Sequence, residues 1–189
     1  DYLESIGMRF GPDLNAYTSF DETVYLLQVP TDSAHYLETA FQILGDWARN
    51  QSFDRTEIEK ERGVVIEEWR IGQGAGARIR SRQLPVLFQD SRYAVRLPIG
   101  EKSVLESFDP SALERFYADW YRPDLMAVIA VGDFDVEQVE RLIRQEFGAI
   151  PAPTRAPERP LYPVPDHTET RVAIATDPEA TASSVGVYY

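Results

Sequence analysis

Cysteine is absent from this 189-residue chain, which excludes disulfides and thiolate metal sites and removes the usual evidence about redox compartment. Histidine is scarce, because His35 and His167 are the only two. His35 stands where a helix is expected to begin and His167 lies in a proline-rich connection, so we expect both to be surface side chains rather than metal ligands. No apolar run reaches about eighteen residues, so the sequence predicts no membrane span.

Basic residues are outnumbered, with 19 Lys and Arg against 31 Asp and Glu and a net charge of −12. Nucleic-acid phosphates would be repelled by such a chain, so we expect no nucleic-acid partner. Hydrophobic residues make up 43% of the sequence, enough for a chain of this length to bury a core.

The apolar spacing predicts an α+β fold, with helices packed on a mostly antiparallel sheet. We expect a first domain over residues 1–150, a minor boundary near residues 97–106, and a proline-rich connection with strands over residues 151–189. The expected helices cover residues up to 6, those after Ser33, and residues 54–71, 78–88, 109–120 and 136–147. The expected strands cover residues 15–20, 23–29, 126–131, 171–176 and 184–189.

The helix expected over residues 54–71 carries carboxylates beside its apolar side. Helical spacing places Glu57, Glu61 and Glu68 close to one stripe, next to the apolar spacing that includes Val65 and Trp69. Glu61 and Glu68 are therefore expected to border the apolar face. A carboxylate there needs a partner, which is a metal ion or an arginine such as Arg62 or Arg70. On residue types alone the arginine is the more common partner.

Four segments in order resemble the pitrilysin/insulinase zinc peptidases, and most closely the PqqL-like periplasmic zinc proteases of bacteria. They are ERGVVIEEWR at residues 61–70, LNAYTS followed by ETVY at 14–19 and 22–25, YRPDLM at 121–126, and VGDF at 131–134. The resemblance covers essentially the whole chain. It implies an α/β roll of the mitochondrial-processing-peptidase type, present as two halves in a larger enzyme.

The resemblance also implies the chemistry of the site. It places Glu68 as the third Zn²⁺ ligand and Glu61 as a residue that orients a ligand or water from outside the coordination sphere. Two histidines and one glutamate leave an open position for a water that attacks a peptide carbonyl. Asn15, Ala16, Tyr17 and Thr18 would form a strand edge that binds an extended peptide through its backbone. Residue types alone favour a plain hydrophobic strand there.

One departure from the family pattern concerns the metal ligands. The family motif, His-x-x-Glu-His on a helix, is missing here and in the family lies shortly before the segment that begins with Asp1. We therefore expect a fragment of a periplasmic zinc endopeptidase that acts on peptides or unfolded proteins. Alone it would be inactive, bind zinc weakly, self-associate and need a second half or partner subunit. The alternatives are a noncatalytic half of the same fold, and a dimerising scaffold in which both carboxylates form salt bridges.

Overall fold

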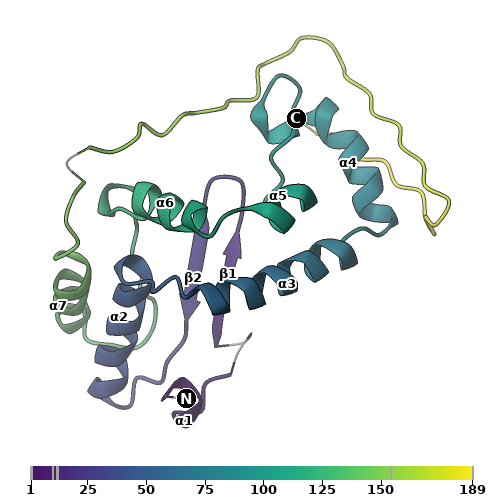
Figure 1. Cartoon of the computed structure of the whole chain (residues 1–189). Coiled ribbons are helices and arrows are strands. Elements are labelled where there is room, and N and C mark those ends of the chain that lie inside the picture. Colours follow the sequence, from purple (N-terminus) through teal and green to yellow (C-terminus); the bar gives the residue numbers. More distant parts are fainter. Residues whose placement is uncertain (1, 10, 12, 154, 189) are drawn as a thin grey trace. The chain divides into compact units, whose positions relative to one another are not determined.

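The computed structural model describes residues 2–9, 11, 13–153 and 155–188, and these residues form two compact units. The first unit combines residues 1–55 with 109–158, and the second combines residues 56–108 with 159–189. The elements of each unit are labelled in Figure 1. Each unit is thus assembled from two separate stretches of sequence. The domain division expected at residue 150 stays a prediction.

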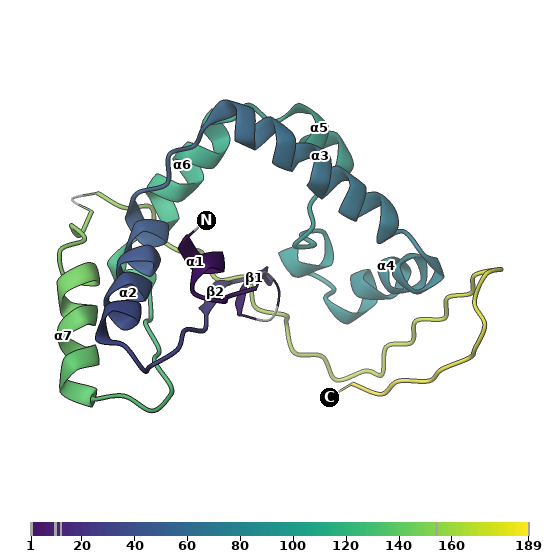
Figure 2. The same ribbon diagram turned by 90° about the horizontal axis from the view of Figure 1, so that it is seen from below.

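The first unit packs two amphipathic helices beside a β-hairpin. Its elements are α1 (Tyr2–Ser5), β1 (Leu14–Thr18), β2 (Thr23–Leu27), α2 (Ala34–Arg49), α6 (Ser111–Trp120), the 3₁₀ turn η2 (Pro123–Leu125) and α7 (Val136–Phe147). Helices α2 and α7 lie side by side in Figures 1 and 2. Their buried side chains Leu37, Phe41, Val139 and Leu142 form the core of this unit.

The sequence determines where α7 begins and which face it buries. The Asp135 carboxylate accepts the Gln138 N–H at 2.7 Å, which satisfies one of the free donors at the helix start. Val139 and Leu142, three residues apart, then face α2, and Phe147 packs against the same core. The apolar side chains of Val128 and Ala130 from the preceding extended segment also contact this core.

The second unit is mainly helical. Its elements are α3 (Arg55–Ile71), of which only Arg55 belongs to the first unit, α4 (Ala75–Leu87), the 3₁₀ turn η1 (Arg92–Ala94) and α5 (Lys102–Ser107). Arg62 joins α3 to the end of α5, because its guanidinium donates to the Leu105 and Phe108 carbonyls at 2.7 and 2.8 Å. The Arg62 side chain also lies over the Phe108 ring, 3.8 Å from its centre.

The α+β class and the expected helices are confirmed, and one helix was missed. Helix α5 was not predicted, because six residues give too short a pattern to recognise. None of the described helices has both the length and the apolar character that crossing a membrane requires.

The expected extent of the sheet is wrong for the described residues. The hairpin forms, but residues 126–131, 171–176 and 184–188 run extended without strand pairing. Residues 126–131 keep the alternation of a strand, with Val128 half-buried and Ile129 84% exposed. A strand needs a hydrogen-bonding neighbour, and residues far apart in sequence must supply it.

Candidate functional site

The predicted site residues lie on two elements in different units. Asn15, Ala16, Tyr17 and Thr18 form most of β1 in the first unit. Glu61 and Glu68 lie on α3 in the second unit.

Three of the five glutamates on α3 are held in ion pairs within the helix. Glu57 pairs with Lys60 at 2.6 Å and Glu59 with Arg62 at 2.9 Å. Glu67 accepts the Arg70 Nε–H at 2.8 Å. The hydrogen bonds from these arginines lower the pKa of the Glu59 and Glu67 carboxyls. The arginines that were expected as partners of Glu61 and Glu68 are thus engaged elsewhere.

Glu61 and Glu68 differ from the other glutamates of α3. Within the described part of the chain, neither carboxylate has an ion pair or a hydrogen bond. Both are exposed, and Val64 between them is 58% exposed. Ile58, Val65, Ile66 and Trp69 are half-buried, and none of the described side chains of this helix is fully buried. The apolar face that the two glutamates were expected to border is therefore only half-buried. The stripe is an open surface with two unpaired carboxylates.

The described residues do not contain a complete set of metal ligands. No group of three or more His, Cys, Asp or Glu side chains able to hold a metal ion occurs among them. His35 and His167 are both exposed, as expected, and the His167 ring nitrogen lies 2.7 Å from the Glu169 carbonyl. Glu68 therefore fits a metal site as one carboxylate donor and no more, because zinc needs about four ligands.

Strands β1 and β2 pair antiparallel, and their register fixes which groups of β1 point outward. Asn15 lies opposite Leu26, Ala16 opposite Tyr25, and Thr18 opposite Thr23. The Gln28 N–H donates to the Asp13 carbonyl at 2.8 Å and the Ser19 N–H to the Glu22 carbonyl at 2.9 Å. In an antiparallel pair, hydrogen-bonded residues alternate with non-hydrogen-bonded ones.

The same alternation shows in which direction the backbone groups of the remaining β1 residues point. Asn15 and Tyr17 share the parity of Asp13 and Ser19, so their backbone groups face β2. The N–H and C=O groups of Ala16 and Thr18 then point away from β2, toward the free edge. The backbone of this edge is what the resemblance assigns to peptide binding.

An aromatic cluster that sequence reasoning missed lies behind this strand. Tyr25 pairs with Ala16 in the hairpin. Its hydroxyl lies 2.6 Å from the Tyr121 hydroxyl, and its ring centre lies 5.7 Å from that of Trp47. Burial and the Tyr121 hydrogen bond raise the pKa of the Tyr25 hydroxyl. The Tyr117 hydroxyl donates to the Trp47 carbonyl at 2.7 Å. The cluster ties β2 to α2 and α6, and the signal in the sequence was the aromatic run at the end of α6.

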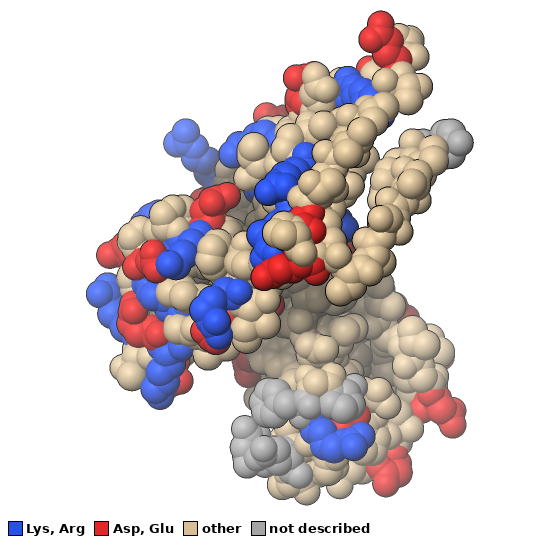
Figure 3. Space-filling model, turned by 90° about the vertical axis from the view of Figure 1, so that its right-hand side faces the viewer, with Lys and Arg blue, Asp and Glu red and all other residues tan. Residues whose placement is uncertain are grey.

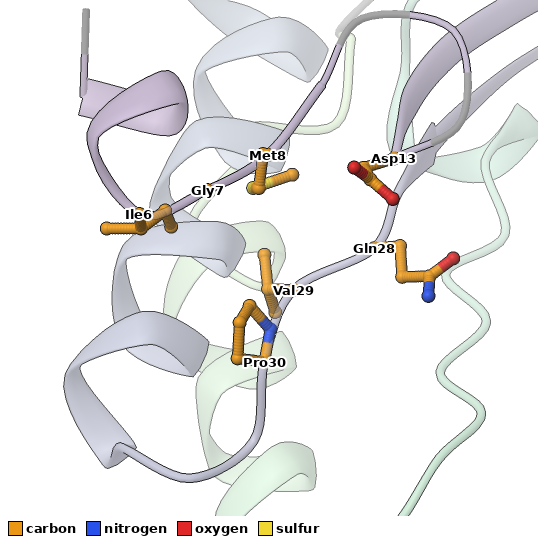
Figure 4. Close-up of a pocket in the computed structure, with 7 residues that line it drawn as sticks. All are labelled: Ile6, Gly7, Met8, Asp13, Gln28, Val29 and Pro30. Atoms are coloured by element: carbon orange, nitrogen blue, oxygen red, sulfur yellow. The ribbon is translucent and has the colours of Figure 1, made fainter.

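A pocket of about 220 Å³ lies near the start of the chain (Figure 4). Met8, Val29 and Pro30 give it an apolar side, and Asp13 and Gln28 give it a polar one. The Asp13 carboxylate already accepts the Arg9 N–H at 2.9 Å. None of the predicted site residues lines this pocket.

Over the described residues of the face in Figure 3, acidic and basic side chains are interspersed rather than gathered by sign.

Sequence profiles of one peptidase family match most of the chain. The profile described as "Insulinase (Peptidase family M16)" matches residues 1–75, and that described as "Peptidase M16 inactive domain" matches residues 107–189. The chain belongs to the M16 family of peptidases, and its helices and small antiparallel sheet match that fold. The resemblance inferred from the four sequence segments is confirmed.

Individual relatives narrow the comparison. The chain is 40% identical over 189 residues to "Zinc protease PQQL-like" of Arabidopsis thaliana and 37% identical over 187 residues to "Probable zinc protease PqqL" of Escherichia coli. These alignments cover 100% and 99% of this chain but 20% of each relative. The chain thus spans about one fifth of the length of these curated relatives.

Solved structures agree with the sequence relatives. The first half of the periplasmic protease PqqL from Escherichia coli superimposes with a TM-score of 0.81 at 38% identity, covering 87% of this chain and 35% of that one. A mutant of the ferredoxin protease FusC in complex with Arabidopsis ferredoxin superimposes with a TM-score of 0.79 at 28% identity, covering 86% of this chain and 18% of that one.

Proposed function

We propose that this chain is part of a zinc-dependent endopeptidase in which Glu68 donates one carboxylate to the metal. The observation that supports this is the contrast on α3. Three glutamates are paired with cations, while Glu61 and Glu68 have no partner among the described residues. A scaffold would have been expected to pair both carboxylates. Relatives that carry the name zinc protease supply the class of metal.

Zinc, when bound, would supply Lewis acidity for hydrolysis of a peptide bond by water. In this proposal Glu68 holds the metal, and Glu61 orients a ligand or water from outside the coordination sphere. The remaining ligands and the general base would come from outside the described residues, since these contain no cluster of three metal-ligating side chains. The chain alone would therefore bind zinc weakly and be inactive.

The peptide would bind along β1 as an added strand. The outward backbone groups of Ala16 and Thr18 would form hydrogen bonds with the backbone of the peptide. Such bonds depend little on the side chains of the peptide. The small Ala16 side chain would leave space for the incoming backbone, while Asn15 and Tyr17 hold this strand in place by pairing with β2. Such an edge suits peptides and unfolded proteins, whose backbones are free to pair.

A noncatalytic role is the second candidate function, and the match of residues 107–189 to the M16 inactive domain favours it for that part. In that role the chain would position substrate or a second half of the peptidase without holding metal.

The similarity to the periplasmic protease PqqL of Escherichia coli supports a periplasmic location for this protein.

Three single substitutions in the full-length protein test the role of Glu68. Glu68→Gln keeps the shape of the side chain but provides a poor zinc ligand, so zinc content and peptide hydrolysis should fall together. Glu61→Gln should cost roughly 10- to 100-fold in metal affinity or activity. Glu67→Gln is the matched control, because Glu67 is paired with Arg70 on the same helix. Metal analysis and cleavage of an unstructured peptide are the measurements.

The outcomes separate the two candidate functions. Full zinc content and full activity in Glu68→Gln would overturn the assignment of this residue. If the full-length protein binds no zinc and cleaves no peptide even without substitutions, the noncatalytic role holds. Equal losses in Glu67→Gln and Glu68→Gln would point to the stability of α3 rather than to metal binding.

A further inference from the structure

One outward backbone group of β1, the Ala16 N–H, is already hydrogen-bonded within the chain. The Ala16 N–H, which points away from β2, donates to the Asn15 side-chain oxygen Oδ1 at 2.8 Å. The Leu14 carbonyl, which points the same way, accepts the Gly11 N–H at 2.9 Å. Both contacts agree with the alternation of the hairpin, since Leu14 and Ala16 share one parity.

The Asn15 carboxamide is chemically a copy of a peptide group. Its Oδ1 is an amide oxygen, like the backbone carbonyl that an added strand would direct at the Ala16 N–H. The same donor cannot make a full hydrogen bond to both oxygens. A peptide that adds to β1 must therefore replace the Asn15 oxygen or bind without this hydrogen bond.

We propose that the Asn15 side chain is an internal competitor for the extended peptide at the β1 edge. This inference rests on the proposed function, because it concerns the same strand edge. In the free protein the Asn15 carboxamide accepts a hydrogen bond from the Ala16 N–H. This donor is then not free to pair with another strand at the exposed edge. On binding, the peptide carbonyl takes this donor and the Asn15 side chain rotates away. Asn15 thus reduces peptide affinity and suppresses unproductive strand pairing.

The hydrogen bond itself can be tested on the 189-residue chain by amide hydrogen exchange at Ala16. The Ala16 N–H should exchange more slowly in the unsubstituted chain than in Asn15→Ala, because alanine has no side-chain acceptor. Asn15→Asp retains an acceptor and should retain protection. Equal exchange rates at Ala16 in the unsubstituted chain and Asn15→Ala would overturn the proposal.

Two proline substitutions in the full-length protein test whether peptides use this edge. Ala16→Pro removes an N–H that points outward, so pairing of β1 with β2 should survive, as proline is tolerated on edge strands in this orientation. Tyr17→Pro removes an N–H that faces β2, so it should weaken the hairpin. A raised KM for an unstructured peptide in Ala16→Pro, with little change in Tm, supports the edge as the binding site. An unchanged KM would overturn the β1 part of the proposed function, and the competitor role with it.

The competitor role has its own signature in the same assay. Replacing one hydrogen bond by another is a modest net exchange, so Asn15→Ala should lower KM roughly 2- to 10-fold. Asn15→Asp should not lower it. If Asn15→Ala instead raises KM while Ala16→Pro also raises it, the peptide edge stands and the competitor role is wrong. That pattern would make Asn15 a direct contact of the bound peptide.

Discussion

Glu61 and Glu68 cannot form ion pairs within their own helix, because neither has a cation three or four residues away. The neighbours of Glu61 at these spacings are Glu57, Ile58, Val64 and Val65, and those of Glu68 are Val64, Val65, Ile71 and Gly72. Glu57, Glu59 and Glu67 each have a Lys or Arg three residues later. The lack of a partner within the helix is thus predictable from the sequence.

Gly63 is another unusual residue of α3. It lies inside the helix and is exposed, and a Cβ added there would meet no atom within 4 Å. Glycine inside a helix is less favourable than alanine, mainly because the unfolded chain has more freedom to lose. Nothing in the described contacts explains why glycine stands at this position.

Gly63→Ala should therefore stabilise the 189-residue chain by about 0.5–1 kcal/mol. Urea denaturation followed by circular dichroism measures the change in the free energy of unfolding. Gly45→Ala is the control, because a Cβ there would lie 3.2 Å from the Glu146 Cβ and must displace it. A Gly63→Ala chain that is less stable than the original would mean that this face of α3 is covered.

At the scale of elements, the parts specified by nearby residues were predictable. The hairpin follows from two alternating runs joined by a short turn, and the longer helices follow from apolar spacing. Residues 126–131 and 171–176 have strand-like sequences as well, yet in the described structure they lack the neighbours that would make them strands. Pairing depends on distant residues, which a local pattern does not identify.

The candidate site shows the same division. The motif around Glu61 and Glu68 was visible in the sequence, and so was the strand with Asn15 and Ala16. The Tyr25–Tyr121 hydroxyl pair was not, because its members are 96 residues apart. The hydrogen bond from Ala16 to Asn15 could be recognised only once the hairpin register was known.

Helix α4 is tied to the last part of the chain by a charged cluster. The Arg78 guanidinium makes two hydrogen bonds of 2.7 Å to the Asp177 carboxylate and one of 2.6 Å to Glu179. Arg82 adds a 2.7 Å hydrogen bond to the Thr176 carbonyl. The bonds from Arg78 lower the pKa of Asp177 to about 2. The C-terminal segment is thus held to α4 by contacts that depend on an ionised carboxylate.

This attachment should weaken in acid. The pKa of Asp177 is lower in the folded chain than its ordinary value of 3.8, so the stabilisation is fully present above that value. It is lost as the pH falls toward about 2. Protection factors of the amides around Ala180, measured by hydrogen exchange, should fall over this range. Asp177→Asn should show low protection already at neutral pH. Full protection of the unsubstituted chain below pH 2 would contradict the role of this carboxylate.

For the whole molecule, the notable feature is apolar surface on extended segments. Ile129 and Val131 are 84% and 92% exposed, and Ile174 and Val185 are 88% and 96% exposed. These side chains lie on segments without strand pairing in the described structure. Exposed apolar side chains beside unpaired backbone groups favour association with other strands.

The 189-residue chain is therefore expected to form dimers or larger species in solution, and light scattering at several concentrations measures this. Replacing Val131 and Ile174 by lysine places charge on the two extended segments and should shift the chain toward the monomer. Arg144→Lys is a control that keeps the charge on an exposed position of α7. Stable monomers of the unsubstituted chain at every concentration would contradict this expectation.

Zinc should change the thermal stability of this chain little, because one or two carboxylates cannot bind it tightly. A ligand stabilises the folded state in proportion to the logarithm of its concentration over Kd, so a complete site would raise Tm clearly. Thermal melts with and without equimolar zinc make the comparison, with Glu68→Gln as the matched variant. A sharp rise in Tm that Glu68→Gln abolishes would mean that residues of this chain complete the zinc site without ligands from elsewhere. An unchanged Tm in both chains is the result that an incomplete site requires.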